Sequence, residues 1–463
     1  MHYKTISELA PLVESGEISP VELTQSQLAR IEQLDGRLKA YATVTADLAM
    51  EQARQVEKEI GEGYYRGKLH GIPIAVKDLC ATAGIRTMGG SAVFADNIPE
   101  SDSTVVIKLR EAGSVLLGKL NMTEGAMGGY NPKLQLPDNP WKESHFTGGS
   151  SSGSGVATAA GMAFGTLGSD TGGSIRHPSA VCGTVGLKPT WGRVSRHGVM
   201  DLAQSLDHVG PLTRSAKDAG IVLQAIAGTD PNDPTSLPHG VPDMLSSVGK
   251  GVEGLKIGWD DGYSTVDLEP SYSQAIEDAM KVMEGLGAKI VPVKMPEILR
   301  EAVAAWPVIC TSEAAAAHIE TYPSQADEYG VFLRAWLKNG TTHTSVEYAE
   351  AHSLRLALNG GLRKTMRDVD VLASAPTSRA GYPITPDEMY NLDPNGRDPW
   401  SGRFTVPTDF AGLPTITLPC GLDVTGMPVS IQFAGHHLSE PVLVGIGDAF
   451  EGATDFHNLH PPV

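Results

Sequence analysis

The spacing of apolar residues changes along this chain: some segments have the helical period and others are short apolar runs. These changes predict a succession of helices and strands. Amphipathic spacing at the helical period predicts helices over residues 6–14, 20–34, 46–60, 103–111, 156–163, 215–227, 272–286 and 441–450. Short apolar runs predict buried strands over residues 38–44, 70–79, 114–119, 164–167, 255–259, 288–293, 369–373, 415–418 and 429–434. This alternation favours an α/β sandwich around a central, parallel or mixed sheet.

Two segments depart from the alternation. Residues 298–368 read as mostly helical, with breaks near Pro307, Pro323 and Gly340, and we interpret them as a helical excursion over one edge of the sheet. Residues 230–247 are rich in Pro, Asp and Ser and predict an exposed loop. Since no internal repeat or clear linker is visible, we predict a single domain.

The most distinctive stretch is residues 147–189, which contains Gly-Gly-Ser-Ser-Ser-Gly-Ser-Gly at 148–155 and Gly-Ser-Asp-Thr-Gly-Gly-Ser-Ile-Arg at 168–176. Glycine permits close backbone approach, and serine adds a hydroxyl beside exposed N–H groups, as a nucleophile and an oxyanion hole require. A Gly/Ser-rich run is also typical of a flexible linker. Here the run is embedded in apolar, small-residue sequence at 156–167, which disfavours a linker.

Composition and charge disfavour two classes of partner. The 463 residues are 41% hydrophobic and 19% charged, which is typical of a soluble globular protein with a large core. A formal net charge of -18 disfavours nucleic acid and anionic membranes as partners. The N-terminus shows no signal peptide, and no apolar stretch has membrane-spanning length. We therefore expect a cytoplasmic protein.

Cysteine and histidine positions do not predict a metal centre. The four cysteines, Cys80, Cys182, Cys310 and Cys420, are far apart and have no paired spacing, so reduced buried thiols are expected. His457 and His460 lie in a Pro-rich tail, and His436 and His437 are adjacent, without the helical spacing and acidic partners of a metal site.

Short catalytic motifs elsewhere are weak. Residues 149–153 satisfy the G-x-S-x-G pattern of α/β-hydrolases, but they follow a turn-rich segment where that motif requires a strand. Ser247 and Lys250 form an isolated Ser-x-x-Lys without companion motifs. The Gly-rich run lacks the Lys-Ser/Thr ending of a P-loop.

A longer set of motifs resembles the amidase signature family of serine hydrolases in order and spacing. The motifs are the run at 148–155, Gly-Ser-Asp-Thr-Gly-Gly-Ser-Ile-Arg-His-Pro at 168–178, Gly-Leu-Lys-Pro-Thr at 186–190, and the lysine-bearing Gly-Ile-Pro-Ile-Ala-Val-Lys-Asp at 71–78. Looser matches at 205–211 and 413–421 extend the likeness over most of the chain. The resemblance implies an α/β/α sandwich with a central twisted mixed sheet covered by helices, as one domain over residues 1–463 with a signature core at about 71–200.

By motif position, the resemblance implies a Ser–Ser–Lys triad of Ser174 as nucleophile, Ser150 as bridging serine after a cis Gly149–Ser150 bond, and Lys77 as base. Lys77 follows a run of apolar residues, and burial of an amine lowers its pKa toward the neutral form that a base needs. The backbone N–H groups of Thr171, Gly172, Gly173 and Ser174 are expected to bind the oxyanion. The mechanism needs no metal or organic cofactor.

Three neighbouring positions have other expected roles. Asp170 and Arg176 flank the nucleophile and are interpreted as structural, forming an ion pair or hydrogen bonds to turn amides. Ser152 stands where many family members have glycine; this departure does not touch the triad.

The leading hypothesis is an amidase that hydrolyses a carboxylic amide of a small molecule to a carboxylate and an amine or ammonia. One alternative is the glutaminase-type subunit of an aminoacyl-tRNA amidotransferase, which would need a partner interface and an Arg/Asp pair for glutamine; Arg379 and Arg403 are available. Hydrolysis of a related carbamate, hydrazide or urea is another alternative. A non-catalytic relative is disfavoured because Lys77, Ser150 and Ser174 are all present.

The acyl pocket is expected, by resemblance, to be lined by residues 121–130 and 376–404. Met127 and Tyr130 in the first segment, with Tyr382, Tyr390 and Trp400 in the second, are consistent with an aryl or alkyl acyl group and equally with ordinary packing. A homodimer is compatible with the sequence.

Overall fold

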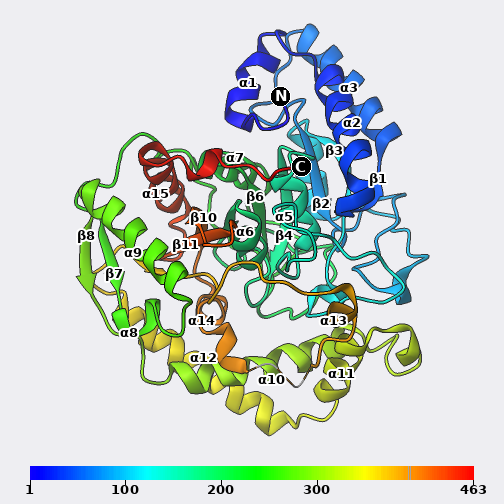
Figure 1. Cartoon of the computed structure of the whole chain (residues 1–463). Coiled ribbons are helices and arrows are strands. Elements are labelled where there is room, and N and C mark those ends of the chain that lie inside the picture. The colour runs from blue at the N-terminus through cyan, green and yellow to red at the C-terminus, as the bar shows by residue number, and fades with distance from the viewer. Residues whose placement is uncertain (395, 397) are drawn as a thin grey trace.

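The computed structural model describes residues 1–394, 396 and 398–463, and a single mixed sheet of eleven strands runs through its centre (Figure 1). The strand order is β1-β3-β2-β4-β6-β5-β10-β11-β9-β7-β8. β2 pairs in parallel with β3 and β4, and β7 with β8 and β9, whereas the other neighbours are antiparallel. The expected α/β fold with a mixed sheet is confirmed.

Each strand predicted from the apolar runs is present, with ends shifted by a few residues. The strands are β1 (Tyr41–Val44), β2 (Pro73–Lys77), β3 (Val115–Leu120), β4 (Gly165–Asp170), β5 (Val185–Lys188), β6 (His208–Thr213), β7 (Lys256–Trp259), β8 (Lys289–Pro292), β9 (Val371–Ser374), β10 (Thr415–Leu422) and β11 (Pro428–Gly435). β5 and β6 were not predicted. β6 contains Gly210 and Pro211, residues with low strand propensity, and it forms because all of it pairs with β4.

The predicted helices are also present, and several short ones were not foreseen. The helices are α1 (Ile6–Glu14), α2 (Pro20–Leu38), α3 (Ala46–Gly61), α4 (Thr104–Glu111), α5 (Ser152–Ala159), α6 (Arg176–Cys182), α7 (Ala216–Ile226), α8 (Asp261–Ser264), α9 (Pro270–Gly285), α10 (Leu299–Ala317), α11 (Val331–Gly340), α12 (Ser345–Thr365), α13 (Pro386–Tyr390), α14 (Val406–Ala411) and α15 (Glu440–Ala453). None of them, over the residues described, is both long and apolar enough to cross a membrane.

Helices cover both faces of the sheet. Gly165 and Gly168 of β4 point to opposite faces because side-chain direction alternates along a strand. A Cβ atom added to Gly165 would meet Val222 of α7, and one added to Gly168 would meet Ser151 immediately before α5. α5 and α7 therefore lie on opposite sides of the strand that leads into the Gly-Gly-Ser loop.

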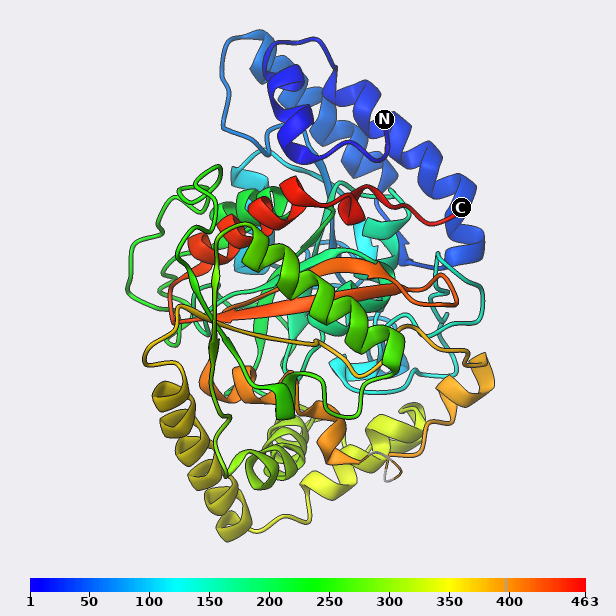
Figure 2. The same ribbon diagram turned by 60° about the vertical axis from the view of Figure 1, so that its left-hand side comes forward.

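The helical excursion forms a separate layer. α10, α11 and α12 pack together at the end of the molecule opposite the N-terminal helices, as both views show (Figures 1 and 2). The chain turns at Pro323, and α11 ends at Gly340, as predicted. The predicted break at Pro307 is wrong, because α10 continues through this residue. A proline costs a helix one hydrogen bond, about 3 kcal/mol, and the packing of α10 against α11 and α12 offsets this cost.

Candidate active site

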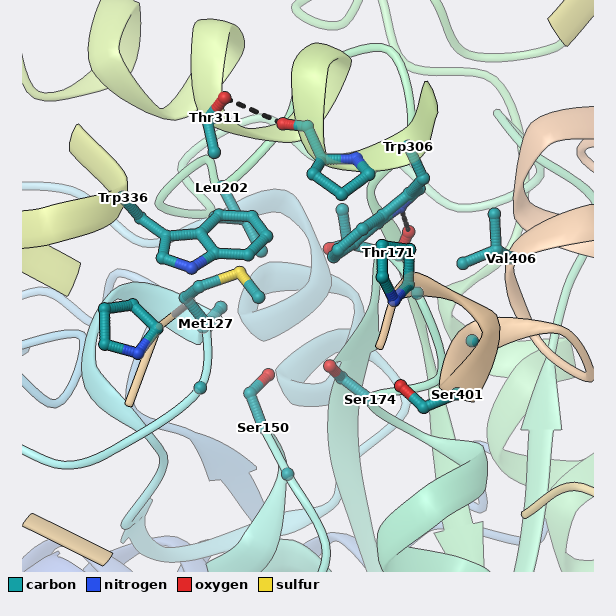
Figure 3. Close-up of a pocket in the computed structure, with 18 of the residues that line it drawn as sticks. Met127, Ser150, Thr171, Ser174, Leu202, Trp306, Thr311, Trp336, Ser401 and Val406 are labelled. Atoms are coloured by element: carbon teal, nitrogen blue, oxygen red, sulfur yellow. Dashed lines mark hydrogen bonds between the residues drawn. The ribbon is translucent and has the colours of Figure 1, made fainter. Parts of the chain in front are cut away.

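A cavity of about 450 Å³ lies where the Gly-Ser segments meet the helical excursion (Figure 3). Its floor carries the hydroxyl groups of Ser150 and Ser174, which point into the same space. Its walls are mainly apolar and come from Met127, Leu202, Val303, Trp306, Trp336 and Val406.

Lys77 ends β2 and is completely buried. Its Nζ atom donates to Ser150 Oγ at 2.6 Å and to Ser169 Oγ at 2.8 Å. Burial lowers the pKa of Lys77 from 10.5 to about 7, although the nearby Cys80, Asp170 and Asp207 oppose this shift. A substantial fraction of the amine is therefore neutral near pH 7 and able to accept a proton.

Ser150 lies between Lys77 and the cavity. Its side chain is buried except where the residue borders the cavity, and the Gly149–Ser150 peptide bond is cis, as expected. The Ser150 carbonyl accepts the N–H of Thr123, and the N–H of Ser151 donates to the Ser174 carbonyl at 3.2 Å. The second bond holds the two serine-bearing segments against each other, and the first joins the Ser150 segment to Thr123.

Ser174 lies in the loop between β4 and α6, and its side chain is half-buried at the cavity floor. The fold thus brings together Lys77, Ser150 and Ser174 from three separate segments. Lys77 itself is not one of the described lining residues, so within this part of the chain its amine meets the cavity through the Ser150 hydroxyl.

The backbone of the loop before Ser174 is fixed by three donors to its carbonyl groups. Trp306 Nε1 donates to the Thr171 carbonyl at 3.0 Å, Thr405 Oγ1 to the Gly172 carbonyl at 2.7 Å, and the His177 N–H to the Gly173 carbonyl at 2.7 Å. Carbonyl and N–H groups of one trans peptide point in opposite directions. Fixing these carbonyls therefore also fixes the directions of the N–H groups.

The expected oxyanion donors are not equivalent. The N–H of Gly173 already donates to Asp170 Oδ1 at 2.6 Å, so Gly173 does not offer the free donor that was expected of it. Across the described residues, the N–H groups of Thr171, Gly172 and Ser174 have no protein acceptor. These three remain available to a ligand in the cavity.

Asp170 and Arg176 form the expected ion pair, with Arg176 Nη2 2.8 Å from Asp170 Oδ1, and both side chains are buried. Arg176 Nη2 also donates to Asp409 Oδ2 at 2.7 Å, which joins the loop to α14. Although burial opposes ionisation, the Arg176 guanidinium holds the pKa of Asp170 far below its usual value. The charged carboxylate accepts the N–H groups of Gly173 and Ile175, so this pair shapes the loop.

Sequence reasoning missed several residues of the site. Ser169, the second partner of Lys77, lies inside the 168–176 motif, so the motif itself was a signal. Asp207, whose pKa is raised to about 7 by burial, accepts the Thr171 hydroxyl at 2.5 Å and lies in the looser match at 205–211. Trp306 and Thr405 lie in segments that gave no signal.

The pocket predictions have mixed outcomes. Met127 lines the cavity, whereas Tyr130 is buried and is not among the described lining residues. In segment 376–404, residues 395 and 397 lie outside the described residues, and the lining comes from Met389, Pro394, Asp398, Pro399, Ser401 and Gly402. Three aromatic residues of that segment serve packing instead: Tyr382 stacks on Phe146, the Tyr390 hydroxyl donates to the Leu134 carbonyl, and Trp400 lies against Arg300.

The other candidates lie elsewhere. The Arg379 guanidinium stacks over Tyr382 at 3.7 Å and that of Arg403 over Phe404 at 4.4 Å, and neither is among the described lining residues. Ser151, the serine of the G-x-S-x-G pattern, is buried and donates to the Ser169 carbonyl. No group of three or more His, Cys, Asp or Glu side chains in the described ranges is arranged to hold a metal ion.

Comparison with known proteins adds independent information. The family profile described as Amidase matches residues 22–444. AmiD of Mycobacterium tuberculosis (strain ATCC 25618 / H37Rv), named as a candidate amidase, is 43% identical over 99% of this chain and 96% of that protein. A glutamyl-tRNA(Gln) amidotransferase subunit from Geobacter sp. (strain M21) is 37% identical over 99% of each chain. The structure of peptide amidase from Stenotrophomonas maltophilia has a TM-score of 0.87 and 30% identity, covering 99% of this chain and 98% of that one.

Proposed function

The chain belongs to the amidase signature family and is an amide-hydrolysing enzyme, and from that premise we propose that it acts through an acyl-enzyme on Ser174. The observation that carries the proposal is the buried contact of 2.6 Å between Lys77 Nζ and Ser150 Oγ, behind a cavity into which Ser174 also points. A serine hydroxyl must lose its proton as it attacks. Lys77 provides a neutral amine for that proton, and Ser150 provides the route.

The first half of the reaction forms the acyl-enzyme. Ser174 Oγ bonds to the amide carbonyl carbon while its proton passes to Ser150 Oγ and the Ser150 proton passes to Lys77 Nζ. The tetrahedral intermediate then collapses, the C–N bond breaks, and the same relay in reverse delivers a proton to the leaving nitrogen. The acyl group remains esterified to Ser174, and the amine or ammonia departs.

The second half repeats the relay with water. A water molecule attacks the ester carbonyl and gives its proton to Ser150 as the Ser150 proton returns to Lys77. As this intermediate collapses, the C–O bond to Ser174 breaks and the proton on Lys77 passes back through Ser150 to Ser174 Oγ. The carboxylic acid is released and the Ser174 hydroxyl is restored, so atoms and protons balance over one turnover. We assign the oxyanion of both intermediates to the N–H groups of Thr171, Gly172 and Ser174, where loss of one donor typically costs on the order of 3 kcal/mol.

The cavity supports an uncharged acyl group, aryl or alkyl, as the substrate class. Its walls are apolar, and neither lysine nor arginine is present in the described part of the lining. A free carboxylate, such as that of glutamine, is usually held by a cationic partner. We therefore favour a simple amide over glutamine, and a carbamate, hydrazide or urea with a similar acyl part would meet the same groups.

The proposal is tested by labelling with a fluorophosphonate followed by intact-mass measurement. Wild type is expected to gain one adduct and Ser174→Ala none. Ser401→Ala is the matched control, because Ser401 lines the same cavity without contact to Lys77, and it should be labelled like wild type. Persistent labelling of Ser174→Ala, or no adduct on wild type, would contradict the assignment.

A further inference from the structure

Trp306 makes two different contacts with the site from one side chain. It lies on α10, in the helical excursion, and its ring lines the cavity opposite the two serines (Figure 3). Its indole N–H donates a hydrogen bond to the Thr171 carbonyl at 3.0 Å.

The ring also lies directly against the loop backbone. A Cβ atom added to Gly172 would be only 2.7 Å from Trp306 Cζ2, so the indole occupies the space that any other residue at 172 would need. Glycine brings the indole close, but it also leaves the backbone at this position with the greatest conformational freedom. The direction of the Thr171–Gly172 peptide plane therefore depends on bonds from outside the loop.

The indole bond determines where the N–H of Gly172 points. The Thr171–Gly172 bond is trans, so a carbonyl that points to the indole turns the Gly172 N–H to the opposite side. That N–H is one of the three without a protein acceptor among the described residues. The next peptide is fixed independently, by Thr405 at the Gly172 carbonyl and by Asp170 at the Gly173 N–H.

We propose that Trp306 is a positioning residue for the oxyanion site, and that its indole ring also contacts the acyl group of the substrate and contributes to substrate specificity. This inference rests on the proposed function. The indole N–H holds the Gly172 N–H in the direction that stabilises the transition state, and the ring face provides a wall for an aryl or alkyl acyl group. The residue that contacts the acyl group is thus hydrogen-bonded to the loop whose N–H groups stabilise the oxyanion.

Two substitutions separate these roles. Trp306→Phe keeps an aromatic wall and removes the donor. Trp306→Gln removes the ring but keeps an N–H donor separated from Cβ by the same number of bonds as in tryptophan. Trp336→Phe is the matched control, because Trp336 lines the same cavity, with its ring 5.7 Å from that of Trp306, and makes no indole hydrogen bond to the loop within the described residues.

Each variant is assayed for kcat and KM by ammonia release from benzamide and propionamide, together with inhibition by a trifluoromethyl ketone, which forms an oxyanion on the serine. Trp306→Phe is expected to lower kcat about tenfold on both amides, the usual effect of losing one hydrogen bond, and to weaken the ketone by a similar factor with little change in KM. Trp306→Gln should retain more kcat on propionamide than Trp306→Phe, while its KM for benzamide rises. Trp336→Phe should change KM alone.

Wild-type kcat and ketone affinity in Trp306→Phe would overturn the inference, as would equal losses of kcat in the Phe and Gln variants, which would indicate packing alone. Thermal unfolding and fluorophosphonate labelling identify variants that fold. Failure of the proposed function is distinct, because activity in Ser174→Ala would refute the nucleophile whatever Trp306 does.

Discussion

Replacing Lys77 with methionine should lower kcat about a thousandfold and at the same time make the fold more stable near neutral pH. The side chain is completely buried, and burial lowers its pKa from 10.5 to about 7. At 1.36 kcal/mol per pKa unit, the charged form is disfavoured by about 5 kcal/mol relative to an exposed lysine. Methionine fills a similar volume without this cost, although it loses two hydrogen bonds, each about 1 kcal/mol.

The lowered pKa of Lys77 determines how the difference in stability between wild type and Lys77→Met changes with pH. Below pH 7 the amine is protonated in both the folded and the unfolded chain, so wild type carries the full cost. Between pH 7 and 10.5 the unfolded chain binds more protons than the folded one, and the stability of wild type rises with pH. The excess stability of Lys77→Met should therefore be largest at or below pH 7 and shrink as pH increases toward 10.

Thermal unfolding of both proteins between pH 6 and 10 measures this difference. In parallel, kcat/KM of wild type should rise with a slope of one through about pH 7 as Lys77 becomes neutral, and the variant should lose about a thousandfold in kcat. Burial also raises the pKa of Asp207 to about 7, so the rise of kcat/KM near pH 7 should persist in Asp207→Asn if Lys77 causes it. A variant that is less stable at every pH, or a rise that vanishes in Asp207→Asn, would refute the reasoning.

Two further substitutions test the surroundings of the site. Ser169→Ala removes one hydrogen-bond acceptor of Lys77, so the amine is held less firmly and kcat should fall about tenfold. Ammonia release measures this effect, with Ser401→Ala as the control. An unchanged kcat would show that Ser169 is dispensable. Arg176→Lys keeps a positive charge but loses the fork that bonds Asp170 and Asp409, and should cost about 3 kcal/mol of stability in thermal unfolding. Exposed Arg363→Lys is its control, and equal melting temperatures for the two variants would contradict a structural role for the buried pair.

Strands of the sheet could be predicted from the sequence where their residues form a largely apolar run. β2 and β11 are continuous runs of buried residues, and their positions follow from the sequence. β6 could not be found this way, since Gly210 and Pro211 disfavour a strand locally and pairing with β4 determines the outcome. The same kind of tertiary effect keeps α10 intact through Pro307.

The site was predictable only as far as local motifs reach. The positions of Lys77, Ser150 and Ser174 follow from the motifs, and the structure brings these side chains together. The bond from Trp306 joins residues 135 positions apart and depends on how the excursion packs, which no local pattern encodes. Tyr130 illustrates the converse, because an aromatic residue suits a pocket and a core equally, and here it belongs to the core.

The position of Lys77 behind Ser150 has a chemical consequence for the durability of the enzyme. The proposed mechanism places a partly neutral amine near an ester on Ser174. Such an amine is itself a competent acyl acceptor, and acyl transfer to it would form an amide that the enzyme could not easily reopen. Ser150 Oγ lies 2.6 Å from Lys77 Nζ, and Lys77 is not among the described residues that line the cavity, so in the proposed mechanism protons would reach the amine through Ser150 while the acyl carbon would not. In the mechanism that we propose, Ser150 would therefore also keep the acyl group away from the Lys77 amine and prevent permanent self-acylation.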